Sequence, residues 1–281
     1  MQHNPAKLAT TAGWALVTGA SAGLGTEFCR QLARRGYNLV LVARREDRLH
    51  ELARQLRQQF NVDTRVHGVD LSHPGAAAQL TSQLQKQGVI VEVLVNNAGY
   101  GLAGHYVDVP WKDHAIFIQV MVTAVCDLTR QLIPAMQATG QGYIINVASL
   151  AGLVPGSAGH TLYAASKSFL IRFSESLALE NQGSGVHVSA LCPGFTFSEF
   201  HDVAGTREIV SKLPAWMWME ANEVVRYGLD SVFRDPPRVL AIPGSVNRSI
   251  ARLVRWLPPA AANALTRRMS RRFRAQKRSA Q

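Results

Sequence analysis

Short apolar runs alternate with longer amphipathic stretches along most of the chain. Seven of these runs predict buried strands, because they are rich in Val, Ile and Leu and lack strict polar alternation. The predicted strands are Trp14 to Thr18, Asn38 to Ala43, Thr64 to Val69, Val91 to Asn96, Tyr143 to Ala148, His187 to Leu191 and Val239 to Ile242. Helices are predicted between them, most clearly at Gly25 to Arg35, Glu46 to Phe60, Trp111 to Met136 and Leu162 to Glu180. This order predicts an α/β fold with a doubly wound parallel sheet and a ligand site at the carboxyl ends of its strands.

Composition divides the chain into a nearly neutral body and a cationic extension. Of the 281 residues, 47% are hydrophobic and 17% are charged, which is typical of one folded domain with a sizeable core. The net charge of +11 is uneven: residues 245–281 hold ten Arg and Lys and no acid, whereas the rest holds 20 bases and 19 acids. We therefore predict one domain over residues 1–244 and a basic amphipathic extension over residues 245–281.

Other features favour a cytoplasmic protein. No secretory signal precedes the first predicted strand, and no run of about 18 uncharged apolar residues is present. The three cysteines, Cys29, Cys126 and Cys192, have no metal-binding spacing and suit a reducing compartment. We therefore expect a cytoplasmic location and no metal site.

A glycine-rich segment joins the first predicted strand to the first helix. Its residues are Gly19, Ala20, Ser21, Ala22, Gly23, Leu24 and Gly25. Glycines let the backbone turn sharply and approach a pyrophosphate, and the helix N-terminus offers unpaired N–H groups. The spacing predicts a dinucleotide site, although a structural turn without a ligand would use the same residue types.

The end of the second predicted strand distinguishes between cofactors. An acidic residue there would bind the ribose of NAD, but Arg44 and Arg45 follow the strand instead. Because a guanidinium suits a 2′-phosphate, the segment favours NADP(H). The alternative is that both arginines only form the solvated start of the next helix.

Two further loops follow predicted strands. Asp70 and Leu71 end the third strand, where Asp70 could position an adenine or act only as a turn residue. Asn97, Ala98 and Gly99 end the fourth strand, and small and amide residues there suit a loop that passes close to a cofactor. A tight turn alone could use the same residues.

Tyr163 and Lys167 lie four residues apart in a predicted helix, so the phenol and the ammonium share one face. A free tyrosine has a pKa of about 10, and a nearby cation favours the phenolate. Such a tyrosine can give a proton to a carbonyl or take one from an alcohol. Ser149, at the end of the fifth strand, could hydrogen-bond the substrate oxygen.

In combination and in this order, these motifs resemble the classical short-chain dehydrogenase/reductase family. The resemblance rests on Thr18 to Gly25, Asn96 to Gly99, Ser149, Tyr163 with Lys167, and Pro193-Gly194, and it covers roughly Gly13 to Gly244. It implies a Rossmann fold that binds a nicotinamide cofactor, with Ser149 polarising the substrate and Tyr163 acting as acid/base. Lys167 would hold the nicotinamide ribose and lower the pKa of Tyr163.

The resemblance has further implications. It places Pro193, Gly194 and Ser198 at the nicotinamide pocket, and the stretch Leu41 to Leu49 is similar to the NADP-preferring branch. The later part of the chain is similar to bacterial members of loosely defined specificity and to membrane-linked ketoacyl and steroid reductases. Members commonly form dimers and tetramers, so a homo-oligomer is implied.

One position departs from the family pattern. The family usually has a catalytic Asn in the middle of the fourth helix, where it supports a water in a proton relay. Alignment of Ile118 to Thr123 with that motif puts Met121 at this position. A thioether cannot donate a hydrogen bond, so the relay has another route, turnover is slow, or the protein binds cofactor without much reduction.

The segments after Gly194 indicate the substrate and the surroundings. Phe195, Phe197, Phe200 and the stretch Pro214 to Met219 are strongly apolar and predict an apolar pocket, although ordinary packing would look the same. In the extension, Ile250, Leu253, Val254 and Leu257 follow helical spacing among arginines. Such a helix can bind the inner face of an anionic membrane; it could also fold onto the body or form a dimer contact, and no specific nucleic-acid ligand is expected.

The sequence thus predicts an NADP(H)-dependent oxidoreductase that reduces a ketone or aldehyde of an apolar substrate, or oxidises the alcohol, with Tyr163 as acid/base. The alternative is a weakly catalytic or non-catalytic NADP(H)-binding sensor or scaffold protein, which Met121 motivates.

Overall fold

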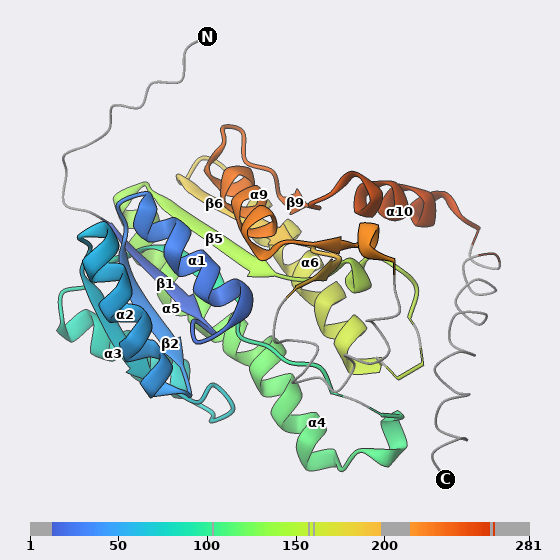
Figure 1. Ribbon diagram of the computed structural model, residues 1–281, viewed down its shortest axis with the longest axis horizontal. Helices are drawn as coiled ribbons and strands as arrows, with labels where there is room; N and C mark the ends of the chain where they lie inside the picture. Colours follow the sequence, from blue (N-terminus) through green and yellow to red (C-terminus); the bar gives the residue numbers. More distant parts are fainter. Residues whose placement is uncertain are drawn as a thin grey trace.

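The computed structural model describes residues 13–102, 104–156, 158–159, 161–197, 214–258 and 261. A seven-stranded parallel sheet forms its centre, in the order β3-β2-β1-β4-β5-β6-β9. The strands are β1 Trp14–Thr18, β2 Asn38–Ala43, β3 Thr64–Gly68, β4 Val91–Asn96, β5 Gly142–Val147, β6 Val186–Leu191 and β9 Leu240–Ala241. The predicted fold class, a doubly wound Rossmann-type sheet in a single domain, is confirmed (Figure 1).

Helices cover both faces of the sheet (Figure 1). The helices are α1 Gly23–Arg34, α2 Glu46–Phe60, α3 Ala76–Lys86, α4 Trp111–Ile118, α5 Ala124–Thr139, α6 Thr161–Glu180, α9 Ala221–Phe233 and α10 Ser245–Trp256. Alternate strand residues enter opposite cores: Val17 packs with α1, α2 and α9, whereas Leu16 packs with α3 and α5. Burial on both sides explains why the strands read as continuous apolar runs.

The chain winds outward in two directions from the centre of the sheet. From β1 it proceeds to β2 and β3, and from β4 it proceeds to β5 and β6. This reversal between β1 and β4 leaves a crevice beyond their carboxyl ends, where ligands bind in open α/β sheets. The fold therefore brings the loops after β1, β4 and β5 to one edge.

The fourth helical segment departs from the prediction of one continuous helix. A π-helical turn, η2 Gln119–Thr123, separates α4 from α5. By length and composition, Trp111–Thr139 could cross a membrane. Leu128, Leu132 and Met136 are instead buried against the sheet, as in the core helix of a globular domain.

Short elements surround the carboxyl edge of the sheet. They are the 3-10 turns η1 Tyr106–Asp108, η3 Leu150–Gly152 and η4 Ala215–Met217, and a small parallel sheet of β7 Phe195–Thr196 and β8 Trp218–Met219. The sequence did not indicate the small sheet, because two-residue strands carry no periodic pattern. The observed last strand, β9, is also shorter than the predicted one, Val239 to Ile242, because only Leu240 and Ala241 pair with β6.

Candidate active site

Key positions in the glycine loop after β1 can hold only glycine. Gly19 and Gly23 have positive φ angles of 68° and 54°, which other residues rarely adopt. A Cβ on Gly25 would lie 2.1 Å from the carbonyl oxygen of Gly19, and a Cβ on Gly19 would lie 2.8 Å from Nδ2 of Asn97. The loop is thus drawn tightly against the start of α1 and the end of β4.

The N-terminus of α1 has no capping group of its own. The N-cap residue Ala22 offers no side-chain hydrogen bond, and the first turn contains no acidic residue. Backbone N–H groups at such an end and the helix dipole favour a phosphate. Together with the glycine cradle, these residues fit a dinucleotide pyrophosphate.

Thr18 holds the glycine loop against the loop after β4. Its hydroxyl accepts hydrogen bonds from the backbone N–H groups of Asn97 and Ala98, both at 3.0 Å, and donates to Val95 O at 3.3 Å. The Asn97 amide returns the contact by donating to Thr18 O at 2.9 Å. The structure therefore places Asn97 as a link between the two cofactor loops, a role that the sequence predicted only in general terms.

Arginines lie beside the glycine loop. Arg45 donates to Ser21 Oγ through Nε at 3.3 Å and through Nη2 at 3.2 Å, which joins the end of β2 to the loop. Arg44 is exposed and close enough to Asp70 to affect its pKa. Both guanidinium groups thus border the predicted 2′-phosphate region.

Asp70 is used by the backbone. Its Oδ1 accepts from Ser72 N at 2.9 Å, which closes a turn after β3 next to Leu71. Burial raises the pKa of Asp70, but the hydrogen bonds from Ser72 and the charge of Arg44 outweigh it and leave the pKa below its usual value. Asp70 therefore acts as a turn residue, and its contact with an adenine stays a prediction.

Ser149, Tyr163 and Lys167 meet beyond the carboxyl end of β5. Ser149 Oγ accepts from Ala151 N at 3.1 Å, and its side chain is hydrogen-bonded to Tyr163. Lys167 is buried, and its Nζ lies 5.7 Å from the centre of the Tyr163 ring. The helical spacing in α6 thus places the phenol and the ammonium on one face, as predicted.

The direction of the Tyr163 pKa shift corrects the prediction. Burial raises the pKa of Tyr163 to about 12, although the hydrogen bond with Ser149 lowers it. Burial lowers the pKa of Lys167 to about 8, and its Nζ donates to Val147 O at 2.7 Å. Desolvation is the largest cause of both pKa shifts, and the phenol is neutral at pH 7.

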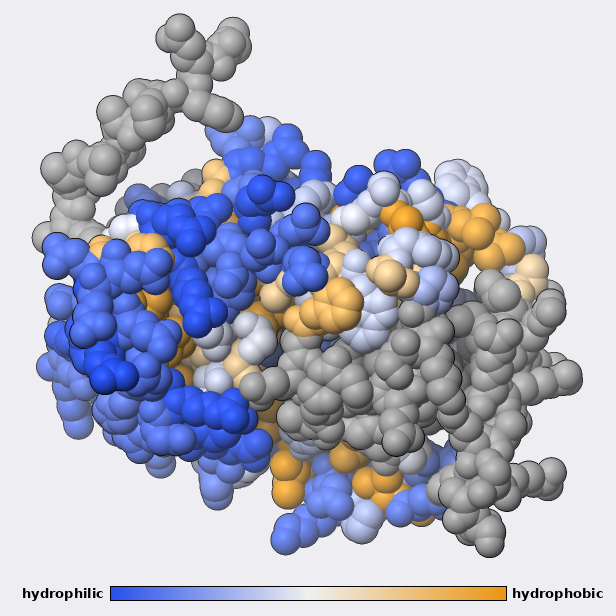
Figure 2. Space-filling model, viewed as in Figure 1, coloured by the Kyte–Doolittle hydropathy of each residue, from blue (hydrophilic) through white to orange (hydrophobic). Residues whose placement is uncertain are grey.

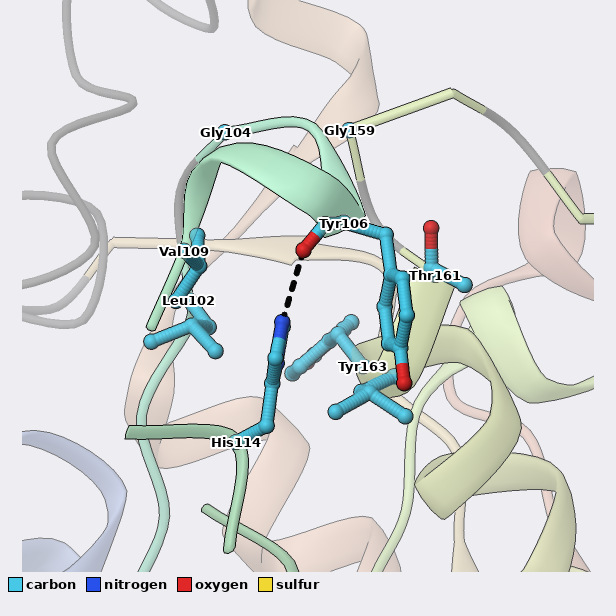
Figure 3. A pocket seen from close by; sticks show the side chains of 9 residues that line it. Leu102, Gly104, Tyr106, Val109, His114, Gly159, Thr161 and Tyr163 are labelled. Atoms are coloured by element: carbon cyan, nitrogen blue, oxygen red, sulfur yellow. Dashed lines mark hydrogen bonds between the residues drawn. The ribbon is translucent and has the colours of Figure 1, made fainter. Parts of the chain in front are cut away.

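A hollow lies beside Tyr163 (Figure 3). Leu102, Gly104, Tyr106, Val109, His114, Gly159, Thr161, Leu162 and Tyr163 line it. His114 is buried, its ring stacks on Tyr106 with centroids 4.5 Å apart, and its Nε2 is 2.9 Å from Tyr106 O. The other ring nitrogen, Nδ1, has no hydrogen-bond partner within the part of the chain that the structure describes. Sequence reasoning missed His114, because a single histidine in a helix carries no pattern.

Aromatic side chains come together on the segment that follows Gly194 and on β8. The Trp218 ring lies 4.7 Å from that of Phe197 in a stacked arrangement and 5.8 Å from that of Phe195. Pro193 O accepts from Leu150 N at 2.9 Å, which ties this segment to η3 beside Ser149. Of the predicted apolar residues, Phe195, Phe197 and Trp218 thus come together directly after the Pro193-Gly194 segment. Ser198 and Phe200 lie outside the described residues.

Comparison with known proteins assigns the family. The sequence profile of the short chain dehydrogenase family matches residues 13–208. The chain belongs to this family. It is an oxidoreductase of the short-chain dehydrogenase type.

Relatives and solved structures agree with this assignment. The chain is 32% identical to the very-long-chain 3-oxoacyl-CoA reductase of Rattus norvegicus over 87% of its own length and 76% of the relative. The mouse protein of the same name is matched over only 58% of its length, at 34% identity over 64% of this chain. A short-chain dehydrogenase from Sphingobium yanoikuyae in complex with NADPH superimposes with a TM-score of 0.75 at 30% identity, covering 88% of this chain and 97% of that one. A structure of a 7beta-hydroxysteroid dehydrogenase gives 0.80 at 26% identity, covering 92% and 96%.

In this short-chain dehydrogenase the position of the usual relay asparagine is structurally unusual. Met121 lies within the π-helical turn η2 and is buried. Its Sδ would lie 2.9 Å from a Cβ on Gly99, so the thioether packs directly on the loop after β4. The helical irregularity thus borders the predicted nicotinamide site.

Proposed function

We propose that this short-chain dehydrogenase uses NADPH to reduce the ketone or aldehyde of an apolar, acyl-type substrate. The observation that carries the proposal is the Ser149–Tyr163 hydrogen bond with Lys167 one helical turn away, at the edge of a hollow. The name of the rat relative, a very-long-chain 3-oxoacyl-CoA reductase, supports the acyl class, as do the apolar rings of Phe195, Phe197 and Trp218.

The cofactor-binding residues follow from the site. The loop from Gly19 to Gly25 and the N-terminus of α1 would hold the pyrophosphate. Arg45, fixed by Ser21, and the exposed Arg44 would hold the 2′-phosphate, since guanidinium groups pair well with phosphate. Bound NADPH supplies the hydride for the carbonyl carbon.

The side chains then direct the proton. Ser149 Oγ accepts a hydrogen bond from Ala151 N and its side chain is hydrogen-bonded to Tyr163, so a substrate oxygen that enters between the two hydroxyls can accept from both. Because burial keeps Tyr163 neutral, the phenol gives its proton to the same oxygen as charge develops there. Lys167, buried nearby, stabilises the phenolate that results, and protons from solvent restore the phenol.

The activity is tested by substitution of the acid. Tyr163→Phe removes the proton donor and keeps the ring, so we expect NADPH-dependent turnover to fall by at least about a hundredfold. NADPH affinity, measured by fluorescence titration, should change little. Turnover across a panel of 3-oxoacyl thioesters, bulky ketones and aldehydes is the measurement. Unchanged turnover in Tyr163→Phe would contradict the assignment.

Cofactor choice is tested at the two arginines. We expect Arg44→Ala with Arg45→Ala to weaken NADPH binding by about tenfold or more, because two charge-assisted contacts are lost. NADH binding should stay the same, since NADH has no 2′-phosphate. Arg54→Ala, an exposed arginine on α2 that pairs with Glu51, is the matched control. Equal loss of NADH and NADPH affinity would argue against this role.

Met121 favours a second candidate function. A chain that binds NADPH but lacks the relay group could act as a weakly catalytic or non-catalytic sensor or scaffold. NADPH binding without turnover on any member of the substrate panel would support this candidate.

A further inference from the structure

Helix α10 exposes apolar side chains that its contacts with the body do not cover. Leu253 is 62% exposed, Trp256 is 83% exposed and Val246 is 37% exposed. In contrast, Asn247 on another side of the helix is buried against the body. Clustered exposed apolar residues on a soluble domain mark an interaction site. Figure 2 shows hydrophobic atoms beside hydrophilic ones in this part of the surface.

The positions on α10 form an amphipathic surface. At about 100° per residue, Val246 and Leu253 lie on one face and Arg252 and Arg255 on another. Trp256 lies between the two groups. Both arginines are exposed, whereas Arg248 turns to the body and donates to Ile242 O at 3.3 Å. We call Val246, Leu253 and Trp256, together with Arg252 and Arg255, the α10 ridge.

Charge indicates what covers the ridge. Residues 245–281 contain ten bases and no acid, so their charge favours an anionic partner. Nucleic acid would match the charge but offers no apolar interior for Leu253 and Trp256. A membrane surface matches both features, because acyl chains receive apolar residues while phosphate headgroups pair with arginines.

We propose that the α10 ridge docks this enzyme on an anionic lipid surface. Leu253, Val246 and Trp256 enter the boundary between headgroups and acyl chains, and Arg252 and Arg255 contact lipid phosphates. Tryptophan prefers this boundary because its ring is apolar and its N–H is polar. The docking is independent of the reaction proposed above.

The packing of α10 fixes how docking orients the active site. Asn247 Nδ2 donates to Pro243 O at 2.9 Å, and its Oδ1 would lie 2.6 Å from a Cβ on Gly194. The helix is therefore joined to the segment beside the nicotinamide pocket. Trp111 and Trp216 are further exposed aromatic side chains, at 66% and 65%. Docking thus holds the mouth of the site close to the lipid, where apolar substrates concentrate.

Vesicle sedimentation tests the proposal with the full chain. Vesicles of phosphatidylcholine with phosphatidylglycerol should carry the protein into the pellet, and vesicles of phosphatidylcholine alone should carry much less. Arg252→Gln with Arg255→Gln should lower the partition coefficient about thirtyfold. Leu253→Ser with Trp256→Ser should lower it by at least about tenfold, because insertion is lost. Brominated acyl chains should quench fluorescence in the intact protein more than in Trp256→Phe.

Matched variants separate docking from general effects. Ile90→Ser changes an exposed apolar residue at the amino end of β4, and Arg30→Gln with Arg130→Gln removes two exposed charges elsewhere. Both should sediment like the intact protein. NADPH titration of every variant reports that the fold is intact.

Four results would overturn the proposal. The intact protein could stay in the supernatant with anionic vesicles, or the Leu253 and Trp256 variant could sediment as the intact protein does. That variant could also change the oligomeric mass in solution, which would make the ridge a contact between copies of the chain. Displacement by duplex DNA, with DNA affinity that falls in the same variant, would favour nucleic acid instead.

Discussion

At the scale of single residues, desolvation decides the protonation of the active site. Tyr163 and Lys167 are both removed from water, which raises the pKa of the phenol to about 12 and lowers that of the ammonium to about 8. A neutral phenol is a proton donor, which is the role that the proposed carbonyl reduction needs from Tyr163. Burial also raises the pKa of the neighbouring Cys192 thiol to about 12, which keeps it inert.

A substitution at Met121 tests the proton relay at the same scale. In Met121→Asn an amide would replace the thioether next to Gly99 and could support a relay water. We expect kcat to rise several-fold, with a loss of about 1–3 kcal/mol in the free energy of unfolding, because a polar group enters a buried site. Steady-state kinetics and urea unfolding are the measurements.

The control for this prediction is Met121→Leu. It conserves volume and adds no hydrogen-bonding group, so kcat should stay the same and stability should change by less than about 1.5 kcal/mol. A kcat in Met121→Asn equal to that of the intact enzyme would mean that the relay does not pass through this position.

At the scale of elements, the site depends on how loops from separate strands are held together. The hydroxyl of Thr18 at the end of β1 accepts from two N–H groups after β4. A second buried set of hydrogen bonds joins β4, β5 and α6: Asn96 donates to Asn146 Oδ1 at 2.8 Å, and Asn146 donates to Ser174 Oγ at 2.9 Å. These links keep the carboxyl edge of the sheet rigid beneath the cofactor loops.

Thr18→Val tests the first link. The substitution keeps the shape of the side chain but leaves the N–H groups of Asn97 and Ala98 without their acceptor. We expect a loss of about 2–4 kcal/mol in the free energy of unfolding and weaker NADPH binding, because the glycine loop is no longer held. Urea unfolding and fluorescence titration measure the two effects.

Thr129→Val separates stability from cofactor binding. Thr129 is also buried and accepts from Asn96 Nδ2 at 3.2 Å, but it lies on α5. The Thr129→Val substitution should lower the free energy of unfolding by about 1–3 kcal/mol without a change in NADPH affinity. If Thr18→Val kept full NADPH affinity, the link would be structural only.

At the scale of the whole molecule, a nearly neutral body is joined to a cationic extension. The described contacts come from the first turn of α10: Asn247 contacts Pro243, Met219 and the Gly194 segment, and Arg248 contacts Ile242 and the Tyr227 ring. The body should therefore need the first turns of α10 but not the residues that follow the helix.

Truncation tests this division. A chain that ends at Leu257 should keep its NADPH affinity and its free energy of unfolding. A chain that ends at Gly244 should lose about 1–3 kcal/mol, because the hydrogen bonds and packing of Asn247 are lost. Urea unfolding followed by circular dichroism gives both values. An equal loss in both chains would show that residues 258–281 stabilise the body.

The sequence by itself determined the order of elements and much of the site. Strands β1, β2 and β4 begin and end where the apolar pattern predicts, because burial on both faces leaves a continuous apolar run. The shared face of Tyr163 and Lys167 also follows from local geometry, since it depends only on the helical repeat.

Only the tertiary structure decided the features that depend on distant segments. The π-helical turn at Met121, the pairing of Thr18 with Asn97 and the stacking of His114 on Tyr106 join residues whose spacing carries no periodic signal. The pKa of Tyr163 belongs to the same group. Its spacing from Lys167 predicted a lowered pKa, but desolvation by the surrounding elements raises it, and burial of this kind is set by packing and not by neighbours in the sequence.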